Sequence, residues 1–392
     1  MNNIFGVELS NGKDLRCRLD LPATDYELLD ALERLHMDPG GKPGWEIIGH
    51  TCFEYLHEYL DRKHSLYELN ELSRRLGNMG REQLAAFEGL FQAALKKREG
   101  PMSMTDLFTY ANSTDRCRVV AEALNDSQLG RFYAESGLIP ELNDIPNNIF
   151  ELLDFEQIGR KARIAEGGIF TERGYIVQHD DLKPAAEPVD TIPQAPAYAF
   201  RILIDRFPFE DNDQPEKQVR LELPATEERI TRALEECGAA SWDEVTYEVE
   251  DSALPGRDED LECNDIIQFN ELAMLIKHLE AGGDLPKLKA VLHATNCDDA
   301  SAAITIAENL NEYIYEPEKC TARDVALEYL RRSVSESTLS ILLPHVLLED
   351  CGKALMASEN AMITPYGLVA RKDGSMLLAP EDSPNEGSMR ML

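Results

Sequence analysis

Repetition constrains the fold of this chain more than any other feature of its sequence. Residues 145–176 form an acidic, partly apolar run that ends in a Gly-rich segment, and residues 347–369 repeat that ending in one register. The register aligns Glu156 with Glu349. It also aligns Gly159 with Gly352, Thr171 with Thr364 and Gly174 with Gly367. A register shared over this distance indicates an internal duplication, in which each copy is one structural unit.

Further landmarks recur in the same order in both halves. The segment LDLPAT at 19–24 returns as LELPAT at 221–226, and the tripeptide NEL at 70–72 returns at 270–272. The other recurring positions are Trp45 with Trp242, Leu32 with Leu234, and Leu84, Phe87, Leu90 and Phe91 with Leu285, Leu288, Val291 and Leu292. The sequence therefore predicts two homologous halves.

The boundaries of these halves follow from composition. Residues 179–197 contain four prolines and almost no periodic apolar pattern, which is typical of an extended linker. Residues beyond 373 are polar and are expected to fray. We therefore expect a first repeat over 1–178, a linker over 179–197, a second repeat over 198–373 and a tail over 374–392.

Local patterns predict an α+β fold for each half. Alternating apolar residues on either side of Asn11-Gly12 predict a β-hairpin, and Thr24 with Glu27 predicts the capped start of a helix. Residues 114–124 are expected to add helical turns, and Leu152, Phe155 and Ile158 are expected to face a core. Each half should hold a small antiparallel sheet with a helix, a helical middle and a mixed C-terminal lobe. Self-repulsion should make such a charged molecule elongated.

Charge is the second strong feature of the sequence. The chain has 72 Asp and Glu against 39 Lys and Arg, a net charge of −33 and a pI near 4.6. This balance argues against binding DNA or an anionic membrane through a basic face. It leaves three interpretations open: an acidic surface that only aids solubility, a basic partner, or a surface that imitates a polyanion.

Motifs of catalysis and of ligand binding are missing from the sequence. It contains no P-loop, G-x-G-x-x-G, H-E-x-x-H or G-x-S-x-G motif. His50, Cys52, His57 and His64 lie close together, but their spacing fits no structural zinc pattern. We expect no enzyme activity, no metal and no cofactor. The scattered cysteines, without C-x-x-C, and the absence of a signal peptide or a long apolar run indicate a cytoplasmic protein.

The acidic residues cluster in three places. Two clusters lie in the second half and one lies in the repeat ending. Any single acidic residue of these clusters is more often part of an ordinary solvated face. The clusters include Glu210, Asp211 and Asp213; then Glu248, Glu250, Asp251, Asp258, Glu259, Asp260, Glu262 and Asp265; then Asp144, Glu151, Asp154 and Glu156. Duplex DNA carries one negative charge per ~1.7 Å, so 33 charges correspond to roughly 55 Å of duplex. Carboxylates spread over such a length are able to imitate phosphates.

These residues resemble the ArdA antirestriction family, whose members are DNA mimics of conjugative plasmids and transposons. The similarity is densest at 145–176, with IPNNIFELLDFEQIGR and GGIFTERGYI, and at 247–310, with YEVEDSALPG, NDIIQFNELAMLIKHL and LPKLKAVL. The segment 126–137 resembles the lobe that precedes the family's ending. Both halves carry the resemblance, whereas familiar members are single-copy proteins that dimerise. Two copies in one chain imply an intrachain pseudo-dimer or a longer homodimer.

The resemblance implies inhibition of type I restriction–modification enzymes by occupation of their DNA-binding groove, without direct binding of nucleic acid. By position it assigns the mimic surface to the acids of the second half, from Glu210 to Asp265. It assigns a contact between units to the repeat ending. That ending comprises Asp144, Glu151, Asp154, Phe155, Glu156, Gly159, Glu349, Asp350 and Gly352. Two other classes stay open: an acidic protein of a mobile element that binds another basic DNA-binding protein, and a hydrolase with paired carboxylates.

Overall fold

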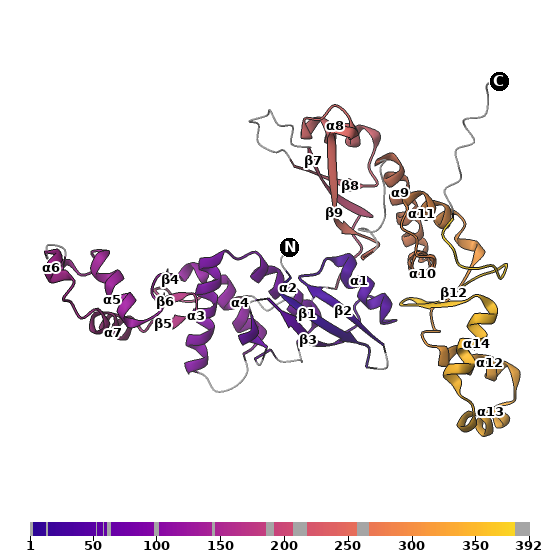
Figure 1. Ribbon diagram of the computed structural model, residues 1–392, viewed down its shortest axis with the longest axis horizontal. Coiled ribbons are helices and arrows are strands. Elements are labelled where there is room, and N and C mark those ends of the chain that lie inside the picture. The colour runs from indigo at the N-terminus through magenta and orange to yellow at the C-terminus, as the bar shows by residue number, and fades with distance from the viewer. Residues whose placement is uncertain are drawn as a thin grey trace. The chain divides into compact units, whose positions relative to one another are not determined.

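The computed structural model describes most of the chain (Figure 1). The described residues are 3–12, 15–51, 53–57, 59–60, 64–97, 102–142, 146–185, 192–206, 218–256 and 266–380. They fold into helices and four small antiparallel sheets of three strands each, which confirms the α+β class. The chain divides into two compact units.

The first unit holds residues 1–9, 18–23 and 44–192. Most of the sheet β2-β1-β3 belongs to it, with β1 at Phe5–Ser10, β2 at Arg16–Leu21 and β3 at Gly44–His50. Its helical middle consists of α2 (Leu66–Gly77), α3 (Arg81–Lys97) and α4 (Met104–Asn112). A second sheet has the order β4-β6-β5, with β4 at Cys117–Val120, β5 at Ile169–Thr171 and β6 at Gly174–Gln178. Helices α5 (Asp126–Glu135), α6 (Asn147–Phe150) and α7 (Phe155–Glu166) lie between β4 and β5 in the chain.

The second unit holds residues 10–17, 24–43 and 193–392, and so includes helix α1 (Asp25–Arg34) from early in the chain. Its first sheet has the order β8-β7-β9, with β7 at Phe200–Arg206, β8 at Val219–Leu223 and β9 at Val245–Ser252. Its helices are α8 (Glu227–Cys237), α9 (Ile266–Gly282), α10 (Leu285–Thr295), α11 (Ala300–Glu308), α12 (Ala322–Ser333), α13 (Glu336–Leu342) and α14 (Leu348–Glu359). Its second sheet has the order β10-β12-β11, with β10 at Tyr313–Glu316, β11 at Met362–Thr364 and β12 at Gly367–Arg371.

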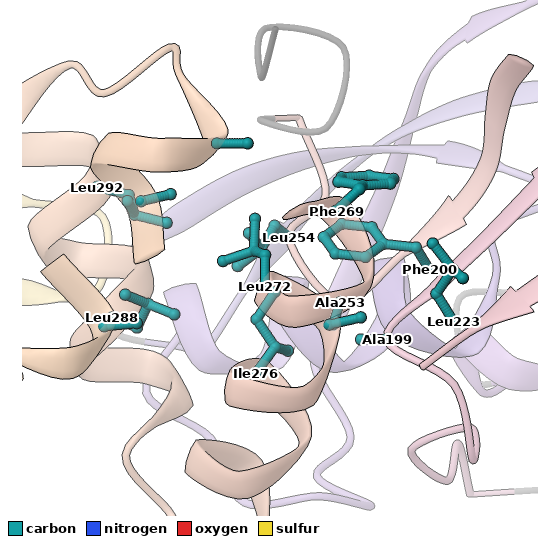
Figure 2. Close-up of a cluster of buried hydrophobic side chains, with 14 of the residues drawn as sticks. Ala199, Phe200, Leu223, Ala253, Leu254, Phe269, Leu272, Ile276, Leu288 and Leu292 are labelled. Carbon is teal, nitrogen blue, oxygen red and sulfur yellow. The ribbon is translucent and has the colours of Figure 1, made fainter. Parts of the chain in front are cut away.

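Helix α9 is central to the core of the second unit. Phe269 stacks on Phe200 of β7 with ring centroids 4.2 Å apart, and Figure 2 shows the two rings side by side. Both side chains are fully buried, as are Leu272 and Ile276 on the same helix. Burial of each such side chain stabilises the fold by about 1.5–3 kcal/mol. Helix α9 therefore holds the sheet β8-β7-β9 against the other helices of the second unit.

The same local hydrogen bonds recur in both halves. Asn70 on α2 accepts from the Ala23 N–H at 2.7 Å and donates to the Ala23 carbonyl at 2.9 Å. Asn270 on α9 makes the same two bonds to Ala225, at 2.7 and 3.1 Å. Both asparagines thus hold the residue that follows a Leu-Pro pair, which explains structurally why NEL and LPAT recur together.

Two local expectations are wrong. Residues Thr114–Arg116 form one 3-10 turn, but Cys117–Val120 form strand β4, paired with β6. Leu152 is 82% exposed instead of facing a core, because α6 ends at Phe150 and α7 begins only at Phe155. Phe155 and Ile158 are half-buried.

Candidate functional site

Strand β9 displays acidic side chains on the outer face of its sheet. Glu248 and Glu250 are both exposed and alternate with the half-buried Val249, as expected from the two-residue period of a strand. Arg220 of β8 binds Glu250 with two bonds, of 2.7 and 2.9 Å. Glu248 has no ion-pair partner among the residues that the structure describes. The uncompensated charge of this face therefore lies at Glu248 more than at Glu250.

The expectation that Asp251 belongs to this exposed surface is wrong. It is 8% exposed, and its carboxylate accepts a hydrogen bond of 2.6 Å from the Tyr198 hydroxyl. Burial, together with this bond, raises the pKa of Tyr198. The cause is an irregular register: Arg201 pairs with Asp251 and Ile202 with Val249, so β9 has an extra residue there. Such a bulge breaks the alternation and turns the next side chain inward.

Several acids expected on the mimic surface lie outside the described residues. These are Glu210, Asp211, Asp213, Asp258, Glu259, Asp260, Glu262 and Asp265. Asp144 of the repeat ending also lies outside them.

The repeat ending is built around a close crossing of helices α5 and α7. A Cβ atom added at Gly159 would lie 1.8 Å from the Asp126 carbonyl oxygen, and one added at Gly130 would lie 1.8 Å from the Phe155 carbonyl oxygen. Only glycine allows the two backbones to approach so closely. Arg163 then binds the Asp126 carboxylate with bonds of 2.7 and 3.0 Å, which lowers the pKa of Asp126.

The acids of this ending are exposed but engaged locally. Glu151 pairs with Arg131 at 3.0 Å, and Glu156 pairs with Arg160 one turn along α7. Asp154 caps α7 by accepting from the Gln157 N–H at 2.9 Å. The half-buried Phe155 packs against Phe150, with ring centroids 5.4 Å apart, and Arg131 lies over its ring. These side chains thus support the local fold.

The second ending repeats the close crossing with helices α12 and α14. A Cβ atom added at Gly352 would lie 1.8 Å from the carbonyl oxygen of Ala322, the first residue of α12. Asp126 is likewise the first residue of α5, so the two crossings use equivalent positions. Glu349 pairs with Lys353 at 3.2 Å, whereas Asp350 is exposed and has no ion pair among the described residues.

A buried ionic cluster in the second unit was not expected from the sequence. Lys289 on α10 is 5% exposed and contacts Asp30 at 2.9 Å and Glu33 at 2.7 Å, both on α1. The Tyr366 hydroxyl donates to Asp30 at 2.8 Å, and Arg34 lies 2.8 Å from the other Asp30 oxygen. Burial lowers the pKa of Lys289, but the two carboxylates outweigh it, so the pKa lies above its usual value. The one available signal was a lysine in the apolar run Leu285–Leu292.

Other kinds of site find no support in the part of the chain that the structure describes. None of its groups of three or more His, Cys, Asp or Glu side chains has a geometry that would hold a metal ion. His64 lies 3.5 Å from Glu68, and Cys52 is outside the described residues.

Among the described helices, none is both long and apolar enough to cross a bilayer.

The family comparison agrees with the resemblance noted in the sequence. Residues 10–177 match the family model described as antirestriction protein (ArdA). That range covers the hairpin turn, α1, the helical middle of the first unit and the complete first repeat ending. No curated protein matches the chain. The first part of the chain, residues 10–177, is therefore similar to the ArdA antirestriction family.

Proposed function

We propose that this chain is an antirestriction protein that mimics DNA and occupies the DNA-binding groove of type I restriction–modification enzymes. The observation that carries this proposal is the ArdA family match over residues 10–177. The net charge of −33 supports it, because a DNA-binding groove lined with Lys and Arg attracts a polyanion.

The described ion pairs limit which acids are able to act as phosphate mimics. Glu151, Glu156 and Glu250 each share their charge with an arginine of the same chain. Exposed acids without such a partner, such as Glu248 and Asp350, keep a full negative charge available to a partner. We therefore assign the mimic role to unpaired acids and a structural role to the paired ones.

We also propose that residues 198–373 are a second copy of the family fold. Both halves contain sheets of the same strand order, namely β2-β1-β3 and β8-β7-β9, then β4-β6-β5 and β10-β12-β11. The asparagine bonds to Ala23 and Ala225 and the glycine crossings at Gly159 and Gly352 occur at equivalent places. A second copy would double the negative surface that one chain offers.

A competition experiment tests the proposed function. Purified chain is titrated into a type I methyltransferase bound to fluorescent duplex DNA, at about 50 and 200 mM salt. We expect displacement of the DNA that weakens steeply with salt, as for a polyanion. Failure to displace duplex from several such enzymes at low salt would refute the proposal. Recovery of a different DNA-binding protein from host lysate, and of no restriction subunit, would favour the alternative of another basic partner.

Two substitutions with opposite expected effects on DNA displacement test whether the β9 face contacts the enzyme. Glu248→Gln removes an uncompensated charge and should weaken displacement. Arg220→Gln removes the cation that neutralises Glu250 and should strengthen it. Equal effects of the same sign would show that this face does not contact the enzyme.

A further inference from the structure

An open hollow in the second unit gathers positive charge on a strongly acidic protein. It has a volume of about 630 Å³ and lies beside β7, β8 and the start of α8, which are labelled in Figure 1. Its lining contains three arginines and one carboxylate, namely Arg201, Arg220, Arg229 and Glu222. Hollows of this size with a few converging polar groups are typical of sites for small ligands. A surface that mimics DNA requires negative charge, so mimicry does not account for these arginines.

Two of the arginines are held by carboxylates, yet each keeps a nitrogen without a partner. Arg201 donates from Nε and Nη2 to Glu222, at 3.2 and 2.9 Å, and its Cζ lies 4.3 Å from the centre of the Tyr198 ring. Arg220 binds Glu250 through its own Nε and Nη2. Among the described residues, the Nη1 nitrogens of Arg201 and Arg220 have no hydrogen-bond acceptor. The two side chains are 37% and 68% exposed, so a ligand is able to reach them.

Arg229 brings a third guanidinium to the same place. Its Nη2 donates to the Arg220 carbonyl oxygen at 3.2 Å, and its Nη1 donates to Glu236 at 3.2 Å. Its Nε has no acceptor within the described ranges. On the sheet, Arg201 pairs with Glu222, two residues along β8 from Arg220, so the two arginines are diagonal neighbours on one face. The three guanidinium groups therefore lie around one small area.

The first half has an acid where Arg229 stands. Thr24 caps α1 as Thr226 caps α8, and the residue three positions after the cap is Glu27 in α1 and Arg229 in α8. In α1 the Thr24 N–H donates to Glu27 at 2.7 Å. With arginine at the same position in α8, the Thr226 N–H has no acceptor in the part of the chain that the structure describes. The second half thus exchanges a capping carboxylate for a cation.

The first half also lacks the arginine of β7. In each half, the residue before a strand phenylalanine donates its N–H at 2.7 Å to the leucine that precedes proline. Counted from this bond, Arg201 stands where the first half has Gly6, whereas Arg220 has Arg18 as its counterpart. Because the first half forms the same sheet order with glycine and glutamate at two of the three places, the fold does not require these arginines.

We propose that this hollow binds a phosphoryl group of a small molecule through Arg201, Arg220 and Arg229. A phosphoryl group carries close to two negative charges at pH 7 and has three terminal oxygens that accept hydrogen bonds. A carboxylate offers only two oxygens in one plane, so it matches three guanidinium groups less well. The Thr226 N–H is a further donor at the edge of the hollow. This proposal is independent of the proposed antirestriction function, since no restriction enzyme takes part in it.

Nearby carboxylates orient the arginines and moderate the attraction. Glu236 and Glu250 do not line the hollow, and neither do Glu227 and Glu228 at the start of α8. Ion pairs between exposed side chains contribute little stability, so a phosphoryl group is able to bind the remaining nitrogens and share the arginines with these acids. The net charge of −33 repels an anion at a distance, but this repulsion is screened beyond about 8 Å at 0.15 M salt.

Isothermal titration calorimetry on the full chain, at about 0.15 M ionic strength, tests the proposal. Inorganic phosphate, pyrophosphate and ADP are the phosphoryl probes, and acetate is the carboxylate probe. Pyrophosphate should bind and acetate should not. Tighter binding of ADP than of pyrophosphate would identify a nucleotide as the ligand class, and the reverse order would identify a free phosphate anion. Absence of binding by all three phosphoryl probes, or binding of a DNA oligonucleotide alone, would overturn the proposal.

Arg229→Glu separates binding from folding, because it gives α8 the residue that α1 has at Glu27. It should restore a capping box, so the melting temperature should not fall. Pyrophosphate binding should weaken about tenfold or more, because charged hydrogen bonds are lost. Arg201→Gln should weaken binding to a similar extent. Wild-type affinity for pyrophosphate in both variants would contradict the proposed site.

Arg18 of β2 supplies the matched control. It is 66% exposed and pairs with Asp20, much as the 68% exposed Arg220 pairs with Glu250, and Arg18→Gln should bind pyrophosphate like the wild type. Phenylglyoxal, which modifies accessible guanidinium groups, then locates the site by mass spectrometry. Pyrophosphate should slow the modification of Arg220 and leave that of Arg18 unchanged. Equal protection of the two arginines, or protection of neither, would overturn the assignment.

Discussion

The Lys289→Met substitution tests how the buried cluster holds α1 in the second unit. Methionine has a similar length, so the change removes the charge and leaves packing nearly intact. It deprives Asp30 and Glu33 of bonds of 2.9 and 2.7 Å. Breaking a buried pair from one side costs about 3–5 kcal/mol. Asp30 keeps Tyr366 and Arg34 as partners and Glu33 is partly hydrated, so we expect about 3 kcal/mol.

Urea unfolding followed by circular dichroism measures this cost. With a slope near 3 kcal/mol per M, the midpoint of the transition that includes the second unit should fall by about 1 M. Hydrogen exchange should show faster exchange of the α1 amides, which places the loss at the cluster. Lys287→Met on the same helix is the control, because Lys287 has no ion pair among the described residues and is only half-buried.

The pH dependence and a double mutant sharpen the test. Because the native pKa of Lys289 lies above its usual value, its contribution is complete below the unfolded pKa of about 10.4 and is lost only as pH rises through the native pKa. The difference between wild type and variant should thus be equal at pH 7 and 9. Adding Asp30→Asn should cost about 1–2 kcal/mol less than additivity predicts. Equal midpoints for Lys289→Met and Lys287→Met, or full additivity, would refute the reasoning.

Three further substitutions test the fold around the repeat landmarks. Gly159→Ala should destabilise by about 3 kcal/mol or more, since its Cβ would lie 1.8 Å from the Asp126 carbonyl, while Gly80→Ala, with 3.8 Å of room, should be harmless in the same urea titration. Asp126→Asn should cost about 1 kcal/mol of stability at pH 7. Because the native pKa of Asp126 is lowered, the melting temperatures of variant and wild type should converge as pH falls below about 4. A difference in melting temperature that stays constant with pH would contradict the ion pair. Asn70→Ala should cost about 2–3 kcal/mol by leaving the Ala23 backbone groups unpaired, and a loss below 0.5 kcal/mol in urea would show that water replaces the amide.

Features encoded within a few residues of sequence were predicted well. The Thr24 and Glu27 capping box and the pairing of the successive strands β1 and β2 both agree with the structure. Each depends on neighbours in the chain, so the sequence alone contains the necessary information.

Features that depend on distant partners were missed. The sequence of Cys117–Val120 does not by itself predict a strand. These residues become β4 because they pair with β6, which lies more than fifty residues later in the chain. Asp251 is turned inward by a bulge, which no spacing rule reveals. Lys289 stands in an apolar run, and its acidic partners Asp30 and Glu33 lie in the other half of the sequence.

The repeated and the non-repeated residues of the two halves have different physical roles. Asn70 with Asn270 and Gly159 with Gly352 recur because each fixes a backbone, through two hydrogen bonds or a close helix crossing. The buried charges at Lys289 and Asp30 do not recur. Lys289 stands where the first half has Glu88, and its α1 partner Asp30 has Arg232 as its α8 counterpart. Under the two-copy proposal the fold needs the first set in both copies, whereas the second set is free to differ. A search for repeats therefore passes over the buried charges by which the two halves differ.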